Sequence, residues 1–472
     1  MILRMVWKSL VAHPVRTAVL GVGFGLGVSV MATLLGVGEV VLDQARSPKL
    51  AGGGDLLITG LNGPVSSARF VLARLQGQQG VGAASPRRRA DLFVVGSDGR
   101  TTPITAHGGI PSLERAIGDP ETSGVDAWVD RPGDERWASP DPSDVLRAMD
   151  RFHPVPDVPA RAASWAEWLY FKGRAGDVQF YMTFLAGPTL PDGRRTAGVR
   201  FQLDRGGVVT SYAASEPLEE AALLRTAPDM TIGGARVRLE GMRYHITMDL
   251  PRMDNPARGR VTGEFYIDAV AGRSLTPIEL RGAGGWVSGY TVPVMSGALS
   301  GGVVADGQQV SLSGTGYHDH NWGFWQGVSW RWGQVQHEGL SYVYGRVIPP
   351  ADAADPERLP GFLVALGPDG PIGYATRVTI DETDVPGSNR PSRIVVSGRA
   401  RDFDLRMEID VESLIVNKGG ALAAGPDFLQ LRANYHVTGS VGGQQVDFRA
   451  PGAAETFRDG AGDRSGGASA PP

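Results

Sequence analysis

The sequence predicts a mainly β protein with two consecutive antiparallel β-barrels, preceded by an N-terminal transmembrane helix and a small α+β segment. From about Ser164 onward, short segments alternate apolar and polar residues and are separated by Gly, Asp and Pro, which is typical of antiparallel strands joined by turns. About 15 such segments exceed one eight-stranded barrel, so two barrels are expected. Ahead of them, residues 17–38 form one long apolar run.

Composition narrows the function classes. The chain has 472 residues, and at about 100–200 residues per domain it holds about two to four domains. The formal net charge is −4, so no electrostatic attraction to nucleic acid is expected. The chain contains no cysteine, which excludes disulfides, thiolate metal sites and a cysteine nucleophile. No cofactor is expected.

The N-terminal apolar run is long enough to cross a bilayer. Thr17–Gly38 carries no charge, and about 20 apolar residues suffice for a transmembrane helix. Arg4, Lys8 and Arg16 precede the run and Glu39 follows it. Because basic residues stay on the cytoplasmic side, we expect a single-pass protein of the bacterial cytoplasmic (inner) membrane, with the N-terminus inside and the main domain periplasmic. A cleaved signal peptide is the alternative, but its apolar core is usually only about 7–15 residues long.

The N-terminus also resembles a known family. His13–Ala18, the apolar run and Gly36–Glu39 resemble the first helix of ABC-transporter permeases of the macrolide-export and lipoprotein-release type. A permease needs several membrane spans, and no other segment is long and apolar enough. The sequence also has no Walker-type phosphate-binding loop. The resemblance therefore implies a fused permease fragment with an ABC transporter permease or ATPase as partner, not a transporter.

Composition shifts divide the chain into six segments. Residues 116–160 are rich in Pro, Asp and Arg, as linkers are, with a short helix expected near Asp144–Arg151. The expected segments are the cytoplasmic stub and transmembrane helix (1–44), a small extracytoplasmic α+β segment (45–115), the linker (116–160), the first barrel (161–295), the second barrel (296–452) and a disordered tail (453–472).

The densest cluster of reactive side chains lies at Gly314–Gly323. Successive side chains of a strand point to opposite faces. One face of this strand then carries Tyr317, Asp319 and Asn321, and the other carries His318, His320 and Trp322. Only one of the two faces can line a given cavity, so two chemical interpretations compete with a structural one.

If the first face lines a cavity, Asp319 is a carboxyl in an apolar environment. Desolvation disfavours the charged form and raises the pKa of such a carboxyl. Protonated Asp319 could then give its proton to a double bond or an epoxide, while Tyr317 and Asn321 position the substrate or a water. Asp319, Tyr317 and Asn321 are therefore the candidate catalytic residues.

If the second face lines the cavity, His318 and His320 have the spacing of a metal pair on a strand. A third ligand would be needed, and His245, His337 and Glu338 are candidates by residue type only. A structural interpretation also stands, in which the cluster is a polar network that closes the end of the barrel. We assign no metal site from this pattern.

A second aromatic stretch, Trp165–Phe171, contains one acid. Trp168 and Tyr170 fall on one face of the expected strand, and Glu167 falls on the other. A charged glutamate among core aromatics is unusual unless it is paired. Glu167 is therefore either a cavity-facing carboxylate or the partner of an arginine at the edge of the strand, and pairing is favoured.

A third aromatic stretch follows the reactive cluster. Trp330, Trp332 and Gln334 share one face of the segment Gln326–Gln336, and Trp325 precedes it. An inward-facing hairpin here would present an aromatic wall with amide groups, which suits a flat or polyene-like apolar ligand. Ordinary core packing is the alternative. Sheet aromatics also stack on single-stranded bases, but no basic groove accompanies these.

Two of these motifs together resemble one family. The motifs Glu167-Trp168-Leu169-Tyr170 and Tyr317-His318-Asp319-His320-Asn321-Trp322-Gly323 resemble the carotenoid 1,2-hydratase (hydroxyneurosporene synthase) and AttH-like family, over about residues 150–450. The resemblance implies two consecutive lipocalin-like domains with apolar cavities, and acid chemistry at Asp319 with Tyr317 beside it. Those enzymes also draw a His and a Trp from an upstream strand. The matching Gly289–Val294 has neither, which speaks against carotenoid hydration itself.

These observations predict a membrane-anchored, extracytoplasmic protein that binds an apolar ligand, isoprenoid-like or lipid-like, with an ABC-type export system as a candidate partner. The alternative is a hydratase, isomerase or cyclase that uses Asp319 as general acid, and a purely structural periplasmic subunit is a third interpretation. The expected ligand contacts are His318, His320, Trp322, Trp325, Trp330, Trp332, Glu167, Trp168 and Tyr170.

Overall fold

A computed structural model describes most of the chain between residues 53 and 458. The described residues are 7, 11–15, 53–59, 65, 68–76, 78–95, 101–120, 122, 125–138, 140–359, 361–367, 370–400, 402–417 and 427–458. They fall into two compact units, Met1–Ser139 and Pro140–Pro472. Within the described residues, no helix is long and apolar enough to span a membrane. The predicted span 17–38 lies outside them.

The first unit is a small structure of helices and strands. Its elements are α3 (Ala68–Leu75), β1 (Arg87–Val95), β2 (Thr101–Gly109), α4 (Pro111–Ala116) and α5 (Glu135–Ala138). β1 and β2 form an antiparallel hairpin. Arg87 at the start of the hairpin forms ion pairs with Glu114 of α4 and with Asp119 just beyond it. These buried carboxylates tie the hairpin to the helix that follows.

The second unit contains an antiparallel sheet of 13 strands. They are β3 (Trp165–Ala175), β4 (Val178–Thr189), β5 (Arg194–Arg205), β6 (Val208–Ser215), β7 (Leu218–Glu219), β8 (Met230–Ile232), β9 (Ala235–Glu240), β10 (Arg243–Pro251), β11 (Arg260–Asp268), β12 (Leu275–Arg281), β13 (Val287–Ala305), β14 (Gln308–Ser311) and β15 (Gly314–Phe324). Their order is β6-β5-β4-β3-β15-β13-β11-β10-β9-β8, with β7 beside β5, and β12 and β14 beside β13.

This first sheet curls until its two ends meet. Tyr212 in β6 forms a bridge with Arg252, directly after β10. The backbone N–H of Met253 also donates to the carbonyl of Ser211 at 2.8 Å. The sheet therefore encloses an interior, which the alternating apolar residues of its strands fill.

Large aromatic side chains occupy that interior. Phe180 of β4 and Phe201 of β5 are fully buried, with ring centroids 5.5 Å apart. Phe265 of β11 contacts Phe180 from the other side, with centroids 4.6 Å apart. Such a packed interior is a core and not a ligand cavity.

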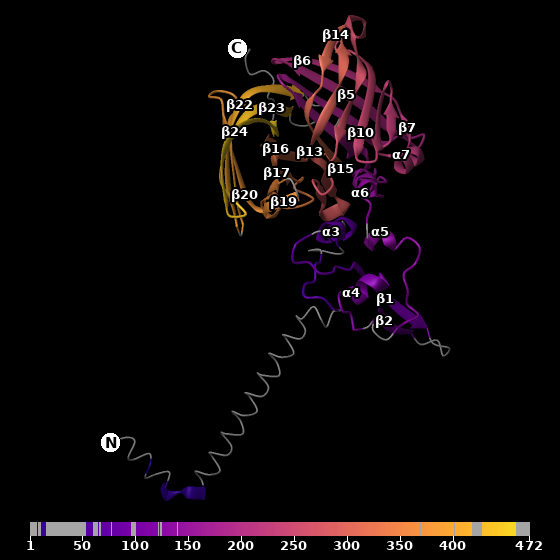
Figure 1. Cartoon of the computed structure of the whole chain (residues 1–472), viewed down its shortest axis with the longest axis vertical. Helices are drawn as coiled ribbons and strands as arrows, with labels where there is room; N and C mark the ends of the chain where they lie inside the picture. Colours follow the sequence, from indigo (N-terminus) through magenta and orange to yellow (C-terminus); the bar gives the residue numbers. More distant parts are fainter. Residues whose placement is uncertain are drawn as a thin grey trace, which may run out of the picture. The chain divides into compact units, whose positions relative to one another are not determined.

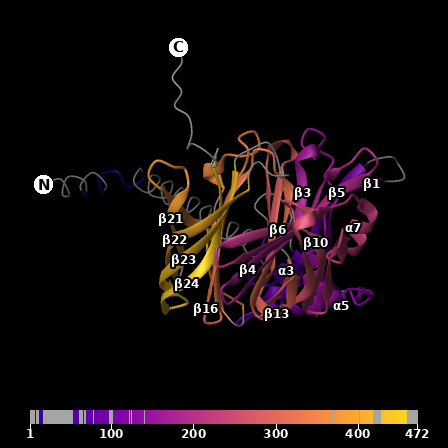
Figure 2. The ribbon, with the colours of Figure 1, turned by 90° about the horizontal axis from the view of Figure 1, so that it is seen from above.

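The second sheet has nine antiparallel strands. They are β16 (Ser329–His337), β17 (Leu340–Ile348), β18 (Phe362–Gly367), β19 (Gly370–Ala375), β20 (Arg377–Asp384), β21 (Pro391–Ala400), β22 (Phe403–Asn417), β23 (Asp427–Val441) and β24 (Gln444–Arg458). Their order is β19-β18-β17-β16-β24-β23-β22-β21-β20. Because β18 and β19 also approach β20 to β22, the sheet forms a nearly closed barrel. Figures 1 and 2 show it beside the first sheet.

The mainly β prediction is confirmed, but the expected boundary between the barrels is wrong. β13 runs from Val287 to Ala305, across the expected boundary at 295, and β15 pairs with both β3 and β13. The reactive cluster therefore belongs to the first sheet, and the second sheet begins only at Ser329. The expected tail from 453 also begins too early, because β24 continues to Arg458.

The expected linker contains a structured segment. α6 (Pro142–Met149) is capped by the Asp141 carboxylate, which accepts from the backbone N–H of Ser143 and Asp144, and such a cap satisfies donors that a helix leaves unpaired. The residues after α6 enter the first sheet, where Asp150 and Phe152 are buried. The remaining helical elements of this unit are α7 (Glu220–Thr226) and the 3-10 turns η2 (Ala162–Ser164), η3 (Pro256–Arg258), η4 (Ala283–Gly285) and η5 (Pro356–Arg358).

A glycine in β13 makes close packing in the first sheet possible. A Cβ atom at Gly289 would lie 1.9 Å from Cε2 of Trp322 on the paired strand. We therefore expect Gly289→Ala to lower the free energy of unfolding by about 1–3 kcal/mol, the usual cost of overpacking. In the control Gly198→Ala, the nearest atom lies 3.7 Å away. Urea unfolding of both variants compares them, and equal stability would contradict the argument.

Candidate functional site

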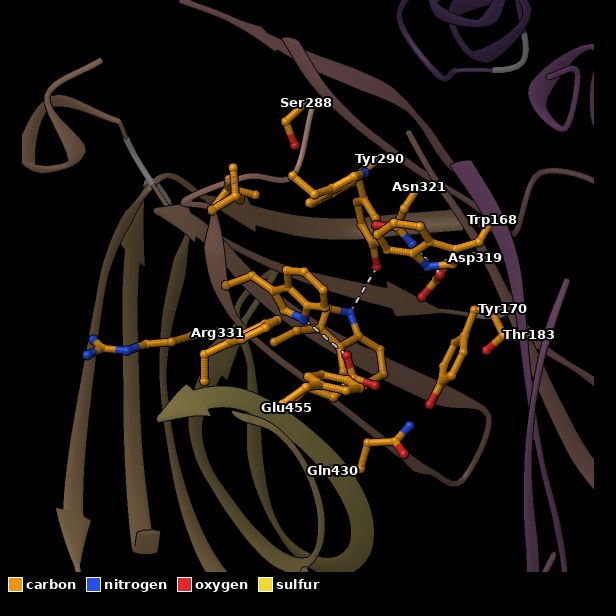
Figure 3. A pocket seen from close by; sticks show the side chains of 18 of the residues that line it. Trp168, Tyr170, Thr183, Ser288, Tyr290, Asp319, Asn321, Arg331, Gln430 and Glu455 are labelled. Carbon is orange, nitrogen blue, oxygen red and sulfur yellow. Dashed lines mark hydrogen bonds between the residues drawn. The ribbon is translucent and has the colours of Figure 1, made fainter. Parts of the chain in front are cut away.

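A large cavity lies between the two sheets of the second unit. Its volume is about 960 Å³, and its walls come from β3, β4, β5, β6, β12, β13 and β15 of the first sheet and from β16, β17, β18, β19, β22, β23 and β24 of the second. Figure 3 shows side chains from both sheets around this space. The sequence predicted cavities inside barrels. The cavity instead forms between them, where the outward faces of the two sheets meet.

Strand alternation in β15 sends one set of side chains toward this cavity. Asp319 and Asn321 line it, and Tyr317 is buried directly beside them. The Tyr317 hydroxyl donates to Oδ2 of Asp319 at 2.8 Å, and the Asn321 amide donates to Oδ1 at 2.7 Å. The three candidate catalytic residues are thus brought together, with both oxygens of the carboxyl held in place.

The electrostatics of Asp319 favour its protonated form. Only 4% of the residue is exposed. Burial raises the pKa of Asp319 well above its ordinary value, and the carboxylate of Glu455 raises it further. The hydrogen bonds from Tyr317 and Asn321 oppose this shift without cancelling it. The surroundings of Asp319 therefore favour its carboxylic acid form over its carboxylate form.

A chain of hydrogen bonds links Asp319 to the second sheet. The hydroxyls of Tyr317 and Tyr290 lie 2.9 Å apart, and Nε1 of Trp332 donates to the Tyr290 hydroxyl at 3.0 Å. Tyr290 lies in Gly289–Val294, the stretch that lacks the His and Trp of the enzymes that the sequence resembles. It was not among the site residues predicted from the sequence. Tyr290 lies on β13 directly opposite Asn321 on β15. Knowledge of this strand pairing would have identified it as a neighbour of the predicted site.

The aromatic wall of the cavity comes from both sheets. The ring centroid of Trp168 lies 4.6 Å from that of Trp325 and 6.0 Å from that of Trp330. Trp330 also packs on Phe457, at 4.3 Å. Of the expected ligand contacts, Trp168, Tyr170, Trp325, Trp330 and Trp332 line the cavity.

A second carboxyl, Glu455 of β24, reaches the same cavity. Burial raises the pKa of Glu455 to about 7, although the Trp330 hydrogen bond and the Lys172 charge oppose this. Nε1 of Trp330 lies 3.2 Å from Oε2 of Glu455. Sequence reasoning missed this residue because it assigned the segment from 453 onward to a disordered tail.

The other face of β15 points into the first sheet. His318, His320 and Trp322 do not line the cavity, so their assignment as ligand contacts is not supported by their position. Nδ1 of His318 lies 3.0 Å from the Tyr170 carbonyl, and Nε2 lies 2.8 Å from Oδ2 of Asp150. Both ring nitrogens of His318 are therefore engaged, which leaves neither free for a metal.

His320 lies between two buried carboxylates. Its Nε2 is 2.9 Å from Oε1 of Glu167, and its Nδ1 is 3.4 Å from Oδ1 of Asp150. Glu167 also accepts from the backbone N–H of His153 at 2.9 Å and lies 2.7 Å from the Nδ1 of that residue. The expected arginine partner of Glu167 is thus replaced by two histidines. We name Asp150, His153, Glu167, His318 and His320 the histidine cluster.

The histidine cluster is a charged network. Burial alone would lower the pKa of His320, but its bonds to Asp150 and Glu167 raise that pKa to about 9. Asp150 shows the complementary effect: burial raises its pKa, and the charges and hydrogen bonds of His318 and His320 bring it well below the ordinary value. Imidazolium and carboxylates therefore neutralise one another inside the sheet.

Donor atoms of His153, Glu167 and His320 lie within 4.8 Å of one another, which is close enough to share a metal ion. In this structure they hydrogen-bond to one another instead. A cation would have to displace the proton that His320 holds between its carboxylates. Of the third ligands considered from the sequence, His245 pairs with Glu264 at 2.8 Å, and among the described residues it belongs to no group that could hold a metal ion. The network interpretation is the stronger.

The comparisons with known proteins concern structure alone. No family model matches the chain, and no curated protein matches it. An AttH-assigned protein from Nitrosomonas europaea is 14% identical, with a TM-score of 0.42 over 65% of this chain and 99% of that chain. CghA with Sch210972 is 10% identical, with a TM-score of 0.41 over 67% and 96%. CghA alone is 11% identical, with a TM-score of 0.40 over 64% and 90%.

The histidine cluster predicts a pH-dependent stability. The pKa of His320 in the folded protein, about 9, exceeds the value of about 6.5 for an unfolded chain. Its contribution is therefore complete below about pH 6.5 and is lost as pH rises through about 9. We expect Asp150→Asn to lower the free energy of unfolding by about 3–5 kcal/mol, the cost of breaking a buried ion pair. The variant should also lose less stability than the wild-type protein as pH rises from about 6.5 to about 9.

Urea unfolding across that pH range measures both effects. The matched control is Asp447→Asn, since Asp447 pairs with His436 at the surface and its side chain is 78% exposed. The control should change stability by less than about 1 kcal/mol. An Asp150→Asn protein with unchanged stability and an unchanged pH profile would show that the cluster carries no net charge interaction.

Proposed function

We propose that this protein binds an apolar small molecule in the cavity between its two sheets. The observation that carries this proposal is the cavity itself, which measures about 960 Å³ and has a predominantly apolar wall that includes four tryptophans. Polar and charged side chains, among them Asp319, Glu455 and Arg331, also reach it. Binding sites for small molecules typically measure about 300–1,000 Å³ and combine apolar walls with a few convergent polar groups. The interior of the first sheet, by contrast, is packed with aromatic side chains such as Phe180, Phe201 and Phe265.

The walls favour a flat or extended unsaturated ligand. Trp168, Trp330 and Trp332 line the cavity, and aromatic faces pack well against rings and conjugated chains. At the polar side stand Asp319 and the buried hydroxyl of Tyr170, which interacts with Glu455. A ligand with an isoprenoid-like or lipid-like skeleton and one polar group would satisfy both features.

A second candidate function is acid chemistry on the bound ligand. Asp319 is buried, held by two donors, and keeps its proton because burial raises its pKa. A neutral carboxyl in an apolar site can protonate an electron-rich double bond. Hydratase, isomerase or cyclase activity would follow from that step. Carotenoid hydration itself is not proposed, because Gly289–Val294 lacks the His and the Trp that the resembling hydratases have in this stretch.

We further propose that the binding module is anchored in the cytoplasmic membrane, with its main domain outside. The uncharged run 17–38 and the basic residues before it support this. An ABC-type export complex is the partner class that the N-terminal resemblance suggests. The apolar ligand would then be held at the membrane surface, where such molecules partition.

Two variants separate binding from chemistry. Asp319→Asn keeps the shape of the side chain and should retain ligand affinity within a few-fold, while any turnover falls by at least about 100-fold. Trp330→Ala removes part of the aromatic wall and should lower affinity by at least about 10-fold. The ligand is first identified by extracting the purified protein and analysing the extract by mass spectrometry. Affinity is then measured by tryptophan fluorescence.

Trp137→Ala is the control, because Trp137 does not line the cavity and should leave affinity unchanged. A protein that carries no apolar molecule and binds none would overturn the proposal. Retained turnover in Asp319→Asn would remove acid chemistry and leave binding standing.

Removal of residues 1–44 tests the anchor. If residues 17–38 span the membrane, the full chain should sediment with membranes and the shortened chain should remain in solution after cell fractionation. Extraction of the full chain should require detergent, and high salt alone should not release it. A shortened chain that still sediments with membranes would contradict the proposed anchor.

A further inference from the structure

Glu455 is an unexplained carboxyl in the cavity wall. It comes from β24 of the second sheet, whereas Asp319 comes from β15 of the first, and both line the same space. Figure 3 shows the two side chains around one hollow, with Tyr170 and Gln430 also at its edge. Two carboxyls in one apolar cavity are costly, so a functional reason for the second one is worth seeking.

Among the described residues no cation forms an ion pair with Glu455, although the charge of Lys172 lowers its pKa. Nε1 of Trp330 donates to Oε2 of Glu455 at 3.2 Å, and hydrogen bonds from Tyr170 and Gln430 also lower the pKa of Glu455. The nearby Lys172 ammonium donates instead to Oε1 of Gln334, at 3.2 Å. A purely structural glutamate in this position would be expected to pair with that lysine, as buried charges generally do.

The two carboxyls interact with each other. The Glu455 charge raises the pKa of Asp319, after the larger effect of burial. Both carboxyls also raise the pKa of Tyr170, again after burial. Since charge interactions of this kind act over short distances, Tyr170 lies within the field of both. Its buried hydroxyl interacts with the Glu455 carboxylate by a hydrogen bond that raises the pKa of Tyr170, so it is placed to pass a proton from that group.

We propose that Glu455 is the second proton-transfer group of this cavity, and that Asp319 and Glu455 act from opposite walls on one unsaturated, isoprenoid-like skeleton. This inference rests on the proposed acid chemistry of Asp319. It narrows the reaction to one in which a proton enters at one carbon and leaves from another, which is double-bond isomerisation or a cyclisation that ends in proton loss.

The proposed step balances without another reactant. The Asp319 carboxyl gives its proton to one alkene carbon, the π electrons form the new C–H bond, and a carbocation remains beside the Asp319 carboxylate. Glu455, as carboxylate, removes a proton from a carbon next to the cationic centre, and the electrons of that C–H bond form the new double bond. Glu455 then returns its proton to Asp319 through the Tyr170 hydroxyl, which restores the starting state.

The protonation states match these roles. The pKa of Glu455, raised by burial to about 7, leaves much of it ionised near neutral pH, while burial and the Glu455 charge favour the protonated form of Asp319. Two groups of the same type are thus set to opposite tasks by their surroundings, as general acid and base pairs require. The aromatic walls would stabilise the intermediate cation by cation–π contact.

The experiment follows hydrogen exchange into a probe. Geranylgeraniol, a linear isoprenoid alcohol with several double bonds, is incubated with the full-length protein in D2O, and its deuterium content is measured by mass spectrometry. Binding of the same probe is measured by tryptophan fluorescence. The variants are Glu455→Gln, Asp319→Asn and the control Glu412→Gln, whose side chain on β22 is 41% exposed. Glu455→Gln keeps the acceptor for Trp330, so the fold should be preserved.

The wild-type protein and Glu412→Gln should bind the probe and introduce deuterium. Glu455→Gln and Asp319→Asn should bind it within a few-fold and lose at least about 100-fold of the exchange rate, with partial recovery in Glu455→Asp. Binding without exchange in the wild-type protein, or exchange that survives Glu455→Gln, overturns the role of Glu455 and leaves ligand binding intact. Failure of the wild-type protein to bind the probe overturns the proposed function as well.

Discussion

The second unit depends on one constraint, which is the burial of the polar strand β15. Tyr317, His318, Asp319 and His320 are all at most 4% exposed. A buried polar group without a partner costs several kcal/mol, and an unpaired charge costs more. Both faces of β15 must therefore be satisfied by partners from elsewhere in the chain. On the inner face the partners are Asp150 and Glu167. On the outer face they are Asn321, which donates to Asp319, and Tyr290, which hydrogen-bonds to both Tyr317 and Trp332.

This constraint explains why the segment before the first sheet is ordered. Asp150 follows α6, and its carboxylate accepts from the Tyr244 hydroxyl at 2.5 Å besides contacting His318 and His320. If the segment that carries Asp150 left the sheet, the His320 imidazolium would lose one of its two carboxylate partners in an apolar interior. The two faces are also coupled, because the positive charge of His320 lowers the pKa of Asp319 and so moderates the larger effects of burial and Glu455. The network on the inner face of β15 thus has a small, opposing effect on the pKa of the carboxyl on the outer face.

Local patterns in the sequence were sufficient for part of this arrangement. Period-two alternation separates the Asp319 face from the His320 face, and the structure places them on opposite sides of β15. Trp168 and Trp330 are far apart in the sequence, yet both could be predicted as ligand contacts, because each lies in a strand rich in aromatic residues. What alternation could not supply was the pairing of β15 with β3, which brings together residues far apart in the chain.

The missed residues share one property, which is that their local sequence is ordinary. Asp150 lies in a Pro- and Asp-rich stretch that has the composition of a linker, and Glu455 follows two alanines near a Gly-rich end. Nothing within a few residues of either indicates burial. Their roles arise only when strand order brings Asp150 to His320 and β24 to β16, where Glu455 stands opposite Trp332. Composition describes a segment alone, whereas a site is defined by what packs against it.

The position of the cavity follows from the same packing. Phe180, Phe201 and Phe265 fill the first sheet, and Met407 and Tyr435 are among the side chains that fill the second. Large outward-facing aromatics on β3 and β16 then prevent the two curved sheets from meeting closely, and the space between them remains. Any molecule in that space contacts Asp319 from one sheet and Glu455 from the other. The proposed ligand would therefore contact both sheets, and the two carboxyls face one space because each sheet supplies one of them.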